Sequence, residues 1–160
     1  MRCAVLTVSD TRRGSADTSG ALIQTLIERA GHEVIARAFV RDDRAAIRRA
    51  ARTLLGRRAL DVLVVTGGTG VAPRDVTPEA LLPLCDRLLP GFGERFRALS
   101  HVEVGNAAWL SRAEAGVTRD RLVVLLPGSS GAVRLALSQV LLPEISHVIR
   151  TLGRFQAHKE

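Results

Sequence analysis

The sequence predicts an α/β fold with a mostly parallel sheet and one antiparallel pairing at its edge. Two observations lead to this prediction. In the first half of the chain, short apolar and β-branched runs alternate with stretches whose apolar residues recur at helical spacing. Near the end, two apolar runs are separated only by a tight turn at Arg119-Asp120, which predicts an antiparallel pair.

The first half contains three predicted strands and two predicted helices. The strands are residues 3–9, 32–40 and 61–65. The last of these, DVLVV, is apolar after Asp61, as expected for a strand covered on both faces. The first helix follows the capping stretch DTSG (17–20) and ends at Gly31, and the second opens at RDDR (41–44) and ends at Gly56. This alternation implies parallel strands joined by right-handed crossovers.

The second half is interrupted more often by proline. A helix begins at Thr77 with Pro78 in its first turn, and residues 91–100 are predicted to form another helix. The strands of the antiparallel pair are residues 115–118 and 121–128. Segment 130–152 is expected to be helical with a break or kink at Pro143, which begins the second piece.

The composition indicates one globular domain and argues against nucleic acid as a partner. The predicted domain covers residues 1–154, and residues 155–160 are expected to be a loose tail. The net charge is +7, but the arginines are scattered and no run of five or more like charges occurs. Aromatic residues make up only 3% of the chain, so the stacking platforms of a single-strand binder are missing.

The sequence offers no signal for a metal site built from cysteine or for export. Cys3 and Cys85 do not form a CxxC motif and read as small core residues. Polar residues follow the N-terminal apolar run at once, which does not fit a signal peptide. No apolar stretch was found to approach the roughly 20 residues of a membrane span. We therefore expect a cytoplasmic protein without a membrane partner.

Three loops that follow predicted strands are rich in glycine and hydroxyl residues. They are SDTRRGSADTSG (9–20), TGGTGVAPRDVTP (66–78) and PGSSGA (127–132). Ligands of open parallel sheets bind outside the carboxyl ends of the strands, and glycine loops expose N–H groups to phosphate. The candidate phosphate- or substrate-binding residues are Ser9, Thr66, Gly67, Gly68, Thr69, Gly70, Arg74, Pro127, Gly128, Ser129 and Ser130. The alternative is that the glycines only form tight turns, since neither GxxxxGK[ST] nor GxGxxG is present.

Carboxylates beside these loops have two possible roles. Asp75 is either a charge at the entry of the helix from Thr77 or a ligand for Mg²⁺ between phosphates. Of Asp42 and Asp43, one can cap the second helix, and the other could reach the strand ends and share the metal. The candidate catalytic and metal-binding residues are therefore Asp75 together with one of these two aspartates.

These stretches together resemble the MoaB/MogA family of molybdenum cofactor biosynthesis proteins. The resemblance covers nearly the whole chain, and the motifs that carry it are LTVSD, DTSG, TGGTGVAPRDVTPEAL, PGFGERFRALS, SRAEAGV and LPGSSGAV. SRAEAGV and the chain length favour the MoaB branch. The resemblance implies a three-layer α/β/α sandwich that assembles as a trimer or hexamer.

The resemblance also implies an activity, molybdopterin adenylyltransferase, which is a nucleotidyltransferase. Active members bind molybdopterin, transfer AMP to it from ATP with Mg²⁺, and pass the product to a protein that inserts molybdate. By matching motifs, Asp75 is the catalytic loop aspartate, Asp42 the second aspartate, and Ser129 the phosphate-binding hydroxyl. MogA-type members have Asn-Pro or similar where this chain has Ser129-Ser130. The alternative function is a molybdopterin carrier or scaffold without turnover.

Part of the surface is expected to be covered by other copies of the chain. Five leucines fall within nine residues, at positions 81, 82, 84, 88 and 89, in a segment broken by proline. Phe92 and Phe96 add to this apolar surface. Some of residues 81–104 are therefore predicted to line a subunit interface, although they could also complete the core of a monomer.

Overall fold

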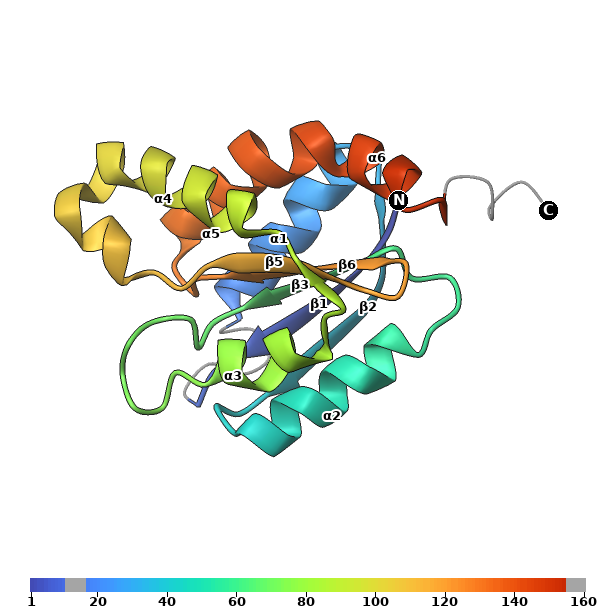
Figure 1. Ribbon diagram of the computed structural model, residues 1–160, viewed down its shortest axis with the longest axis horizontal. Helices are drawn as coiled ribbons and strands as arrows, with labels where there is room; N and C mark the ends of the chain where they lie inside the picture. The colour runs from blue at the N-terminus through green and yellow to red at the C-terminus, as the bar shows by residue number, and fades with distance from the viewer. Residues whose placement is uncertain (11–16, 155–160) are drawn as a thin grey trace.

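The computed structural model describes residues 1–10 and 17–154, and its central feature is one six-stranded sheet (Figure 1). The strands, in spatial order, are β2 (Glu33–Val40), β1 (Arg2–Val8), β3 (Val62–Thr66), β6 (Arg121–Leu126), β5 (Glu114–Thr118) and β4 (Arg87–Leu88). The pairings β2–β1, β1–β3 and β3–β6 are parallel, whereas β6–β5 and β5–β4 are antiparallel. The mostly parallel sheet with an antiparallel edge is confirmed. The predicted tail, 155–160, lies outside the described residues.

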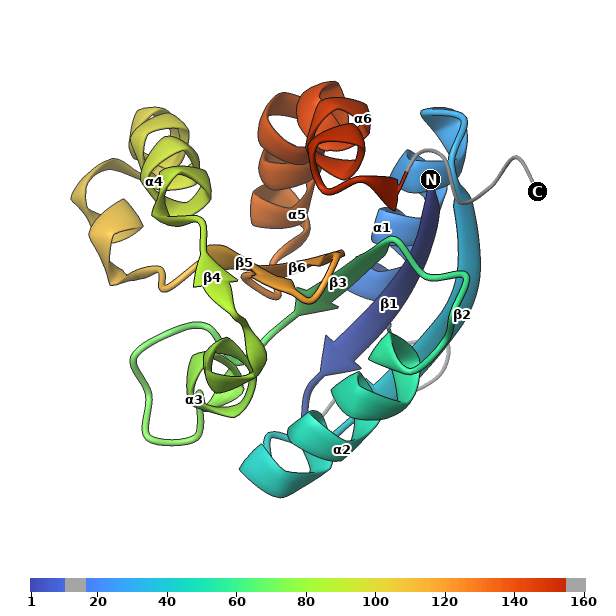
Figure 2. The same ribbon diagram turned by 45° about the vertical axis from the view of Figure 1, so that its right-hand side comes forward.

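Helices cover both faces of the sheet, which confirms the three-layer α/β/α sandwich (Figure 2). One layer holds α1 (Thr18–Arg29), α4 (Pro90–Val104), α5 (Ser130–Ala136) and α6 (Leu142–Thr151), and the other holds α2 (Arg44–Leu55) and α3 (Thr77–Leu81). Shorter helical turns are η2 (Leu82–Leu84), η3 (Gly105–Leu110) and the π-helical η4 (Leu137–Leu141).

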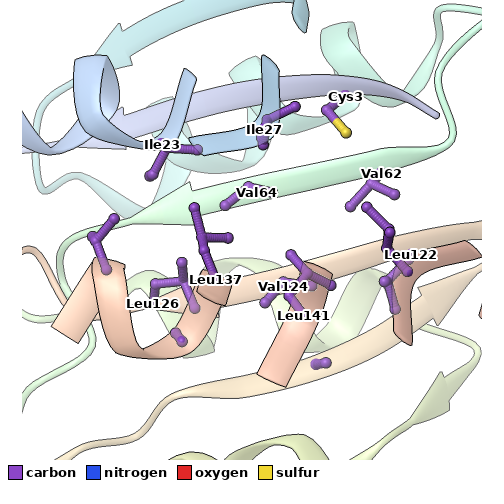
Figure 3. Close-up of a cluster of buried hydrophobic side chains, with 14 of the residues drawn as sticks. Cys3, Ile23, Ile27, Val62, Val64, Leu122, Val124, Leu126, Leu137 and Leu141 are labelled. Carbon is purple, nitrogen blue, oxygen red and sulfur yellow. The ribbon is translucent and has the colours of Figure 1, made fainter. Parts of the chain in front are cut away.

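Two hydrophobic clusters lie on opposite faces of the sheet, and β3 contributes to both. Val62 and Val64 pack with Ile23 of α1 and with α5 in one cluster (Figure 3). Leu63 and Val65 pack on the other side with α2. Because successive side chains of a strand point to opposite faces, only a strand covered on both sides reads as an unbroken apolar run.

The helix starts follow from carboxylate caps. Asp17 precedes α1, and its Oδ1 accepts a hydrogen bond of 2.9 Å from Gly20 N. Asp43 precedes α2, and its Oδ1 accepts a bond of 2.7 Å from Ala46 N. Each cap satisfies a backbone donor that the first helical turn leaves free. Asp43 is therefore the capping member of the Asp42–Asp43 pair.

Two local features differ from, or refine, the sequence prediction. Strand β4 was not predicted, because Arg87 and Leu88 are both exposed and too short a run to show any alternation. The break near Pro143 is confirmed and takes the form of the π-helical η4, after which Pro143 lies in the first turn of α6. Proline cannot donate to the preceding turn, and the wider π turn accommodates that missing bond.

The C-terminal helical run Ser130–Thr151 is 22 residues long and, by length and composition alone, apolar enough to cross a membrane. This corrects the expectation that no apolar stretch approaches the length of a membrane span. The run packs as a core helix, with Val133, Leu137, Leu141, Ile145 and Ile149 buried in one cluster. Leu137 and Leu141 are labelled in Figure 3. Core helices of globular proteins satisfy the same test, so it is weak evidence for a membrane span.

Both cysteines belong to the core, as predicted. Cys3 is fully buried on β1, and burial raises the pKa of its thiol to about 12. Cys85 is half-buried and packs against the opposite cluster. A thiol with so high a pKa is inert at neutral pH, so Cys3 serves packing.

Candidate functional site

A polar cavity of about 280 Å³ opens where the four parallel strands end. It is lined by Thr7, Val8, Ser9, Asp10, Ser19, Asp42, Thr66, Gly68, Arg74, Asp75, Gly128 and Ser129. These residues come from the end of β1, the start of α1, and the loops after β2, β3 and β6. The cavity therefore occupies the edge where ligands of open α/β sheets bind.

The glycine turn after β3 brings the walls of this cavity together. Gly67 and Gly68 have φ of +99° and +64°, a region that favours glycine. A Cβ on Gly67 would lie 2.1 Å from the carbonyl oxygen of Val8, and one on Gly68 would lie 2.8 Å from Oδ1 of Asp42. Thr77 closes the turn, since its Oγ1 donates to Gly67 O at 2.8 Å and its N–H to Gly68 O at 3.0 Å. Glycine is thus required at both positions, because the backbone has positive φ and because neighbouring atoms leave no room for a Cβ.

Asp75 shapes its own loop and does not cap α3. Its Oδ2 accepts a bond of 3.0 Å from Ala72 N, and its N–H donates to Ala72 O at 2.9 Å. A Cβ on Gly70 would lie 2.6 Å from the same Oδ2, so glycine leaves room for the carboxylate. The residue before α3 is Val76, and no side chain caps that helix. Asp75 is therefore not the N-cap of α3, and its carboxylate lines the cavity.

Asp42 lies in the same cavity with an unsatisfied oxygen. Its Oδ1 is buried and has no hydrogen-bond partner among residues 1–10 and 17–154. Its pKa is raised, chiefly by burial and then by the neighbouring charges of Asp10 and Asp75, while Arg74 acts in the opposite direction. Asp42 N donates to Asp10 Oδ1 at 3.2 Å, so three carboxylates converge here. Such a cluster disfavours its own charge and gains from a bound cation.

The donor set suits a metal that completes its coordination with ligand oxygens. Within residues 1–10 and 17–154, no group of three or more His, Cys, Asp or Glu side chains is arranged to hold a metal ion alone. Mg²⁺ is commonly held by one or two carboxylates together with substrate phosphates and water. Asp42 and Asp75 fit that pattern, because both line the cavity and the charge of Asp75 raises the pKa of Asp42.

The third loop contributes hydroxyl groups and connects to the second. Ser129 is the N-cap of α5, and its Oγ accepts a bond of 3.3 Å from Ala132 N. The hydroxyl proton of Ser129 is not used in that bond and can be donated to an anion. Thr66 Oγ1 donates to Pro127 O at 3.0 Å, which joins the two loops at their bases.

The structure brings most of the predicted site residues to the cavity. Those that line it are Ser9, Asp42, Thr66, Gly68, Arg74, Asp75, Gly128 and Ser129. Gly67, Thr69, Gly70, Pro127 and Ser130 do not line it; the first four lie in the loops that form it, and Ser130 is the exposed first residue of α5. Thr69, for example, is only 2% exposed, and its carbonyl accepts from Arg112 N at 2.9 Å.

Three polar lining residues, Thr7, Asp10 and Ser19, were not among the named candidates, although Asp10 and Ser19 lie in the first of the three predicted loops. Thr7 Oγ1 donates to Asp17 Oδ2 at 3.0 Å, and Arg37 Nη2 donates to the same oxygen at 2.8 Å. This buried network fixes the cavity wall beside α1. A signal was available, because a threonine at the end of an otherwise apolar strand marks the carboxyl edge of the sheet.

Comparison with known proteins places the chain in a family. Residues 4–147 match the family model described as a probable molybdopterin binding domain. The chain belongs to the MoaB/MogA family of molybdenum cofactor biosynthesis proteins. The molybdenum cofactor biosynthesis protein B of Bacillus subtilis (strain 168) is 46% identical over 155 residues, which is 96% of this chain and 91% of that protein.

Solved structures of this family have the same fold. A crystal structure of a molybdenum cofactor biosynthesis protein B has 44% identity and a TM-score of 0.92, covering 96% of both chains. The MoaB of Pyrococcus furiosus, described as a tungsten cofactor synthesizing protein, has 38% identity and a TM-score of 0.85, covering 94% of this chain and 96% of its own. A MogA structure has 29% identity. The chain thus resembles the MoaB branch more closely, and its role is in molybdenum cofactor biosynthesis.

Proposed function

We propose that this chain binds molybdopterin and adenylylates it with Mg-ATP before molybdate insertion. The observation that carries the proposal is the buried, unpartnered Oδ1 of Asp42 beside Asp75 in the cavity. The same cavity offers glycine backbone and serine hydroxyls, which suit phosphate. Carboxylates at a phosphate site would repel the ligand unless a cation lies between them.

In the proposed reaction, the terminal phosphate of molybdopterin attacks the α-phosphorus of ATP. The new bond joins a phosphate oxygen to that phosphorus, the bond between the α-phosphorus and its bridging oxygen breaks, and pyrophosphate leaves. A phosphate nucleophile is already ionised at neutral pH, so no general base is needed. The cavity accordingly needs no histidine, and none lines it.

The residues of the chain would then act by positioning and by charge. Asp42 and Asp75 are the side chains that would hold Mg²⁺, which supplies neutralisation of the triphosphate. Gly68 and Gly128 let phosphate approach the backbone closely, and Ser129 donates its hydroxyl proton. Arg74 adds positive charge at the mouth of the cavity. Placing two anions together in this way is the main task of the catalyst.

Replacing Asp75 with asparagine tests the proposal. Asp75→Asn preserves size and an acceptor for Ala72 N, but removes the negative charge. Pyrophosphate release from ATP in the presence of molybdopterin should fall by roughly 10²-fold or more, the scale of losing one electrostatic stabiliser. Molybdopterin should still bind. Full activity together with a lower melting temperature would contradict a catalytic role and leave Asp75 as a structural residue of the loop.

The same assay, applied to the wild type, tests the alternative that the chain is a carrier without turnover. If the wild type binds molybdopterin but releases no pyrophosphate with Mg-ATP, the chain is a carrier or scaffold rather than a nucleotidyltransferase. We further propose a cytoplasmic trimer or hexamer that hands its product to a molybdate-insertion protein. Support for assembly comes from the exposed apolar side chains of α4 and η3, with Val102 84% and Trp109 76% exposed. Leu81 and Phe96, which were counted toward the predicted interface, are instead buried in the core of the chain itself.

A further inference from the structure

The segment of residues 70–75 protrudes from the surface of the protein, and we call it the excursion. Residues 71–74 are exposed, and Val71 is 64% exposed. Among the hydrogen bonds of the described residues, those within this excursion join only Ala72 and Asp75. Loops with few internal bonds open locally at low free-energy cost. The position of the Asp75 carboxylate therefore depends on contacts from outside the loop.

Arg112 supplies such contacts from the segment between η3 and β5. Its backbone N–H donates to Thr69 O at 2.9 Å. Its guanidinium donates through Nε to Gly70 O at 2.8 Å and through Nη2 to Asp75 O at 2.6 Å. The third nitrogen, Nη1, pairs with Glu79 in the first turn of α3. One side chain thus joins both ends of the excursion and the helix that follows it.

Only arginine can make this set of contacts. Its planar guanidinium presents donors on three nitrogens in a fixed fork, whereas lysine has one ammonium group on a flexible stem. The side chain is two-thirds buried, with 33% exposed, so its bonds are partly protected from water. The ion pair with Arg112 also lowers the pKa of Glu79.

Arg112 is itself held in place from α4. Arg97 Nη1 donates to the carbonyls of Ser111 at 3.3 Å and Ala113 at 3.0 Å, which flank Arg112 in the chain. Gly93 allows this close packing, since a Cβ there would lie 2.4 Å from Ala113 O. The segment that presents Arg112 is therefore braced against a helix of the opposite layer.

We propose that Arg112 is a positioning residue for the transfer reaction. It holds the Gly70–Asp75 excursion closed, and so keeps the Asp75 carboxylate at the cavity without touching substrate. The role in transfer rests on the proposed function. The role in holding the loop can be measured without turnover.

The test compares Arg112→Gln with Arg112→Lys and with two matched controls. Arg48→Gln removes another arginine that bonds to α3 carbonyls, those of Ala80 and Glu79, but not to the loop. Glu79→Gln removes the ion pair and keeps the carbonyl bonds of Arg112. Hydrogen exchange by mass spectrometry is followed over peptides containing residues 70–77. Pyrophosphate release gives kcat and KM for ATP on the same samples.

Arg112→Gln should speed exchange in this segment by about tenfold, the change expected when roughly one net charge-assisted hydrogen bond is lost. Its kcat should fall, with KM for ATP changed by less than about threefold, because the loop carries a group needed in the transition state. Arg112→Lys should recover part of both losses. The two controls should exchange within about threefold of wild type in this segment.

The outcomes separate the inference from the function. The positioning role is overturned if Arg112→Gln exchanges at the rate of wild type. It is also overturned if Glu79→Gln speeds exchange as much as Arg112→Gln does. If Arg112→Gln exchanges faster but keeps the kcat of wild type, Arg112 has no positioning role in the transfer reaction. A wild type that releases no pyrophosphate overturns the proposed function instead, and the exchange data still decide whether Arg112 holds the loop.

Discussion

Replacing Asp42 with asparagine should stabilise the ligand-free protein while it removes a proposed metal ligand. The wild-type carboxylate has a buried oxygen without a partner, and it faces the charges of Asp10 and Asp75. Asparagine keeps the shape, carries no charge, and can donate an N–H to a neighbouring carboxylate. The substitution therefore relieves repulsion and an unsatisfied group together.

The size of this effect follows from the partial exposure of Asp42. A buried unsatisfied polar group costs about 1–3 kcal/mol, and a half-buried residue belongs at the lower end, about 1 kcal/mol. For a chain of 160 residues this corresponds to a rise in melting temperature of about 2–4 °C. The neighbouring Asp43→Ala should do the reverse, because losing the N-cap of α2 costs about 1 kcal/mol.

The advantage of Asp42→Asn should depend on pH. The folded protein raises the pKa of Asp42 from 3.8, so folded Asp42 binds its proton more tightly than unfolded Asp42. The wild type then loses stability as the pH rises from 3.8 through the raised pKa, and loses no more above it. The variant lacks this titration, so its advantage is smallest below pH 3.8 and complete above the raised pKa of Asp42.

The assay is thermal unfolding of wild type, Asp42→Asn and Asp43→Ala at a fixed protein concentration and at several pH values, without Mg²⁺ or nucleotide. Concentration is fixed because assembly would itself shift the midpoint. An Asp42→Asn midpoint at or below that of wild type at pH 7, with an unchanged circular dichroism spectrum, would refute the claim that the carboxylate is costly in the free protein.

Three further perturbations address binding, assembly and stability. Ser129→Ala should weaken molybdopterin binding by about 1–2 kcal/mol in calorimetry, and unchanged affinity would make Ser129 only an N-cap. Light scattering should find a trimer or hexamer that Val102→Glu converts to smaller species with an intact fold, whereas a wild-type monomer at micromolar concentration would end the interface prediction. Arg154→Gln leaves Asp61, which is fully buried, without its 3.0 Å partner and Asp120 without its 2.7 Å one. It should cost about 3 kcal/mol, or about 6–12 °C in melting temperature, and a shift below 2 °C would contradict this.

The layers of the fold could be predicted because single segments carry their own signal. The run DVLVV reads as a strand covered on both faces, and β3 does pack on both sides. Asp17 and Asp43 stand where helix caps are expected, and both cap. The form of the break before Pro143 could not be predicted, because a kink and a π turn can each accommodate the backbone N–H that proline lacks.

The site was predictable in outline for a different reason. Carboxyl ends of parallel strands meet at one edge, so polar and glycine-rich loops after such strands converge whatever their distance in sequence. That rule found Gly68, Asp75 and Ser129, which line the cavity. It could not choose between Asp42 and Asp43, which differ only in the direction of the side chain. The choice follows from the start of α2, where Asp43 is used as the cap and Asp42 remains for the cavity.

Arg112 shows what the rule leaves out. The residue precedes β5, which pairs antiparallel with β6 and therefore starts at the same edge where β6 ends. Strand starts as well as strand ends reach the ligand edge of a mixed sheet, and the segment before β5 lies there beside the Asp75 loop. An antiparallel strand added to a parallel sheet thus brings a segment to the site from the opposite chain direction. In this protein that segment carries Arg112, whose guanidinium donates to both ends of a loop more than thirty residues earlier in the chain.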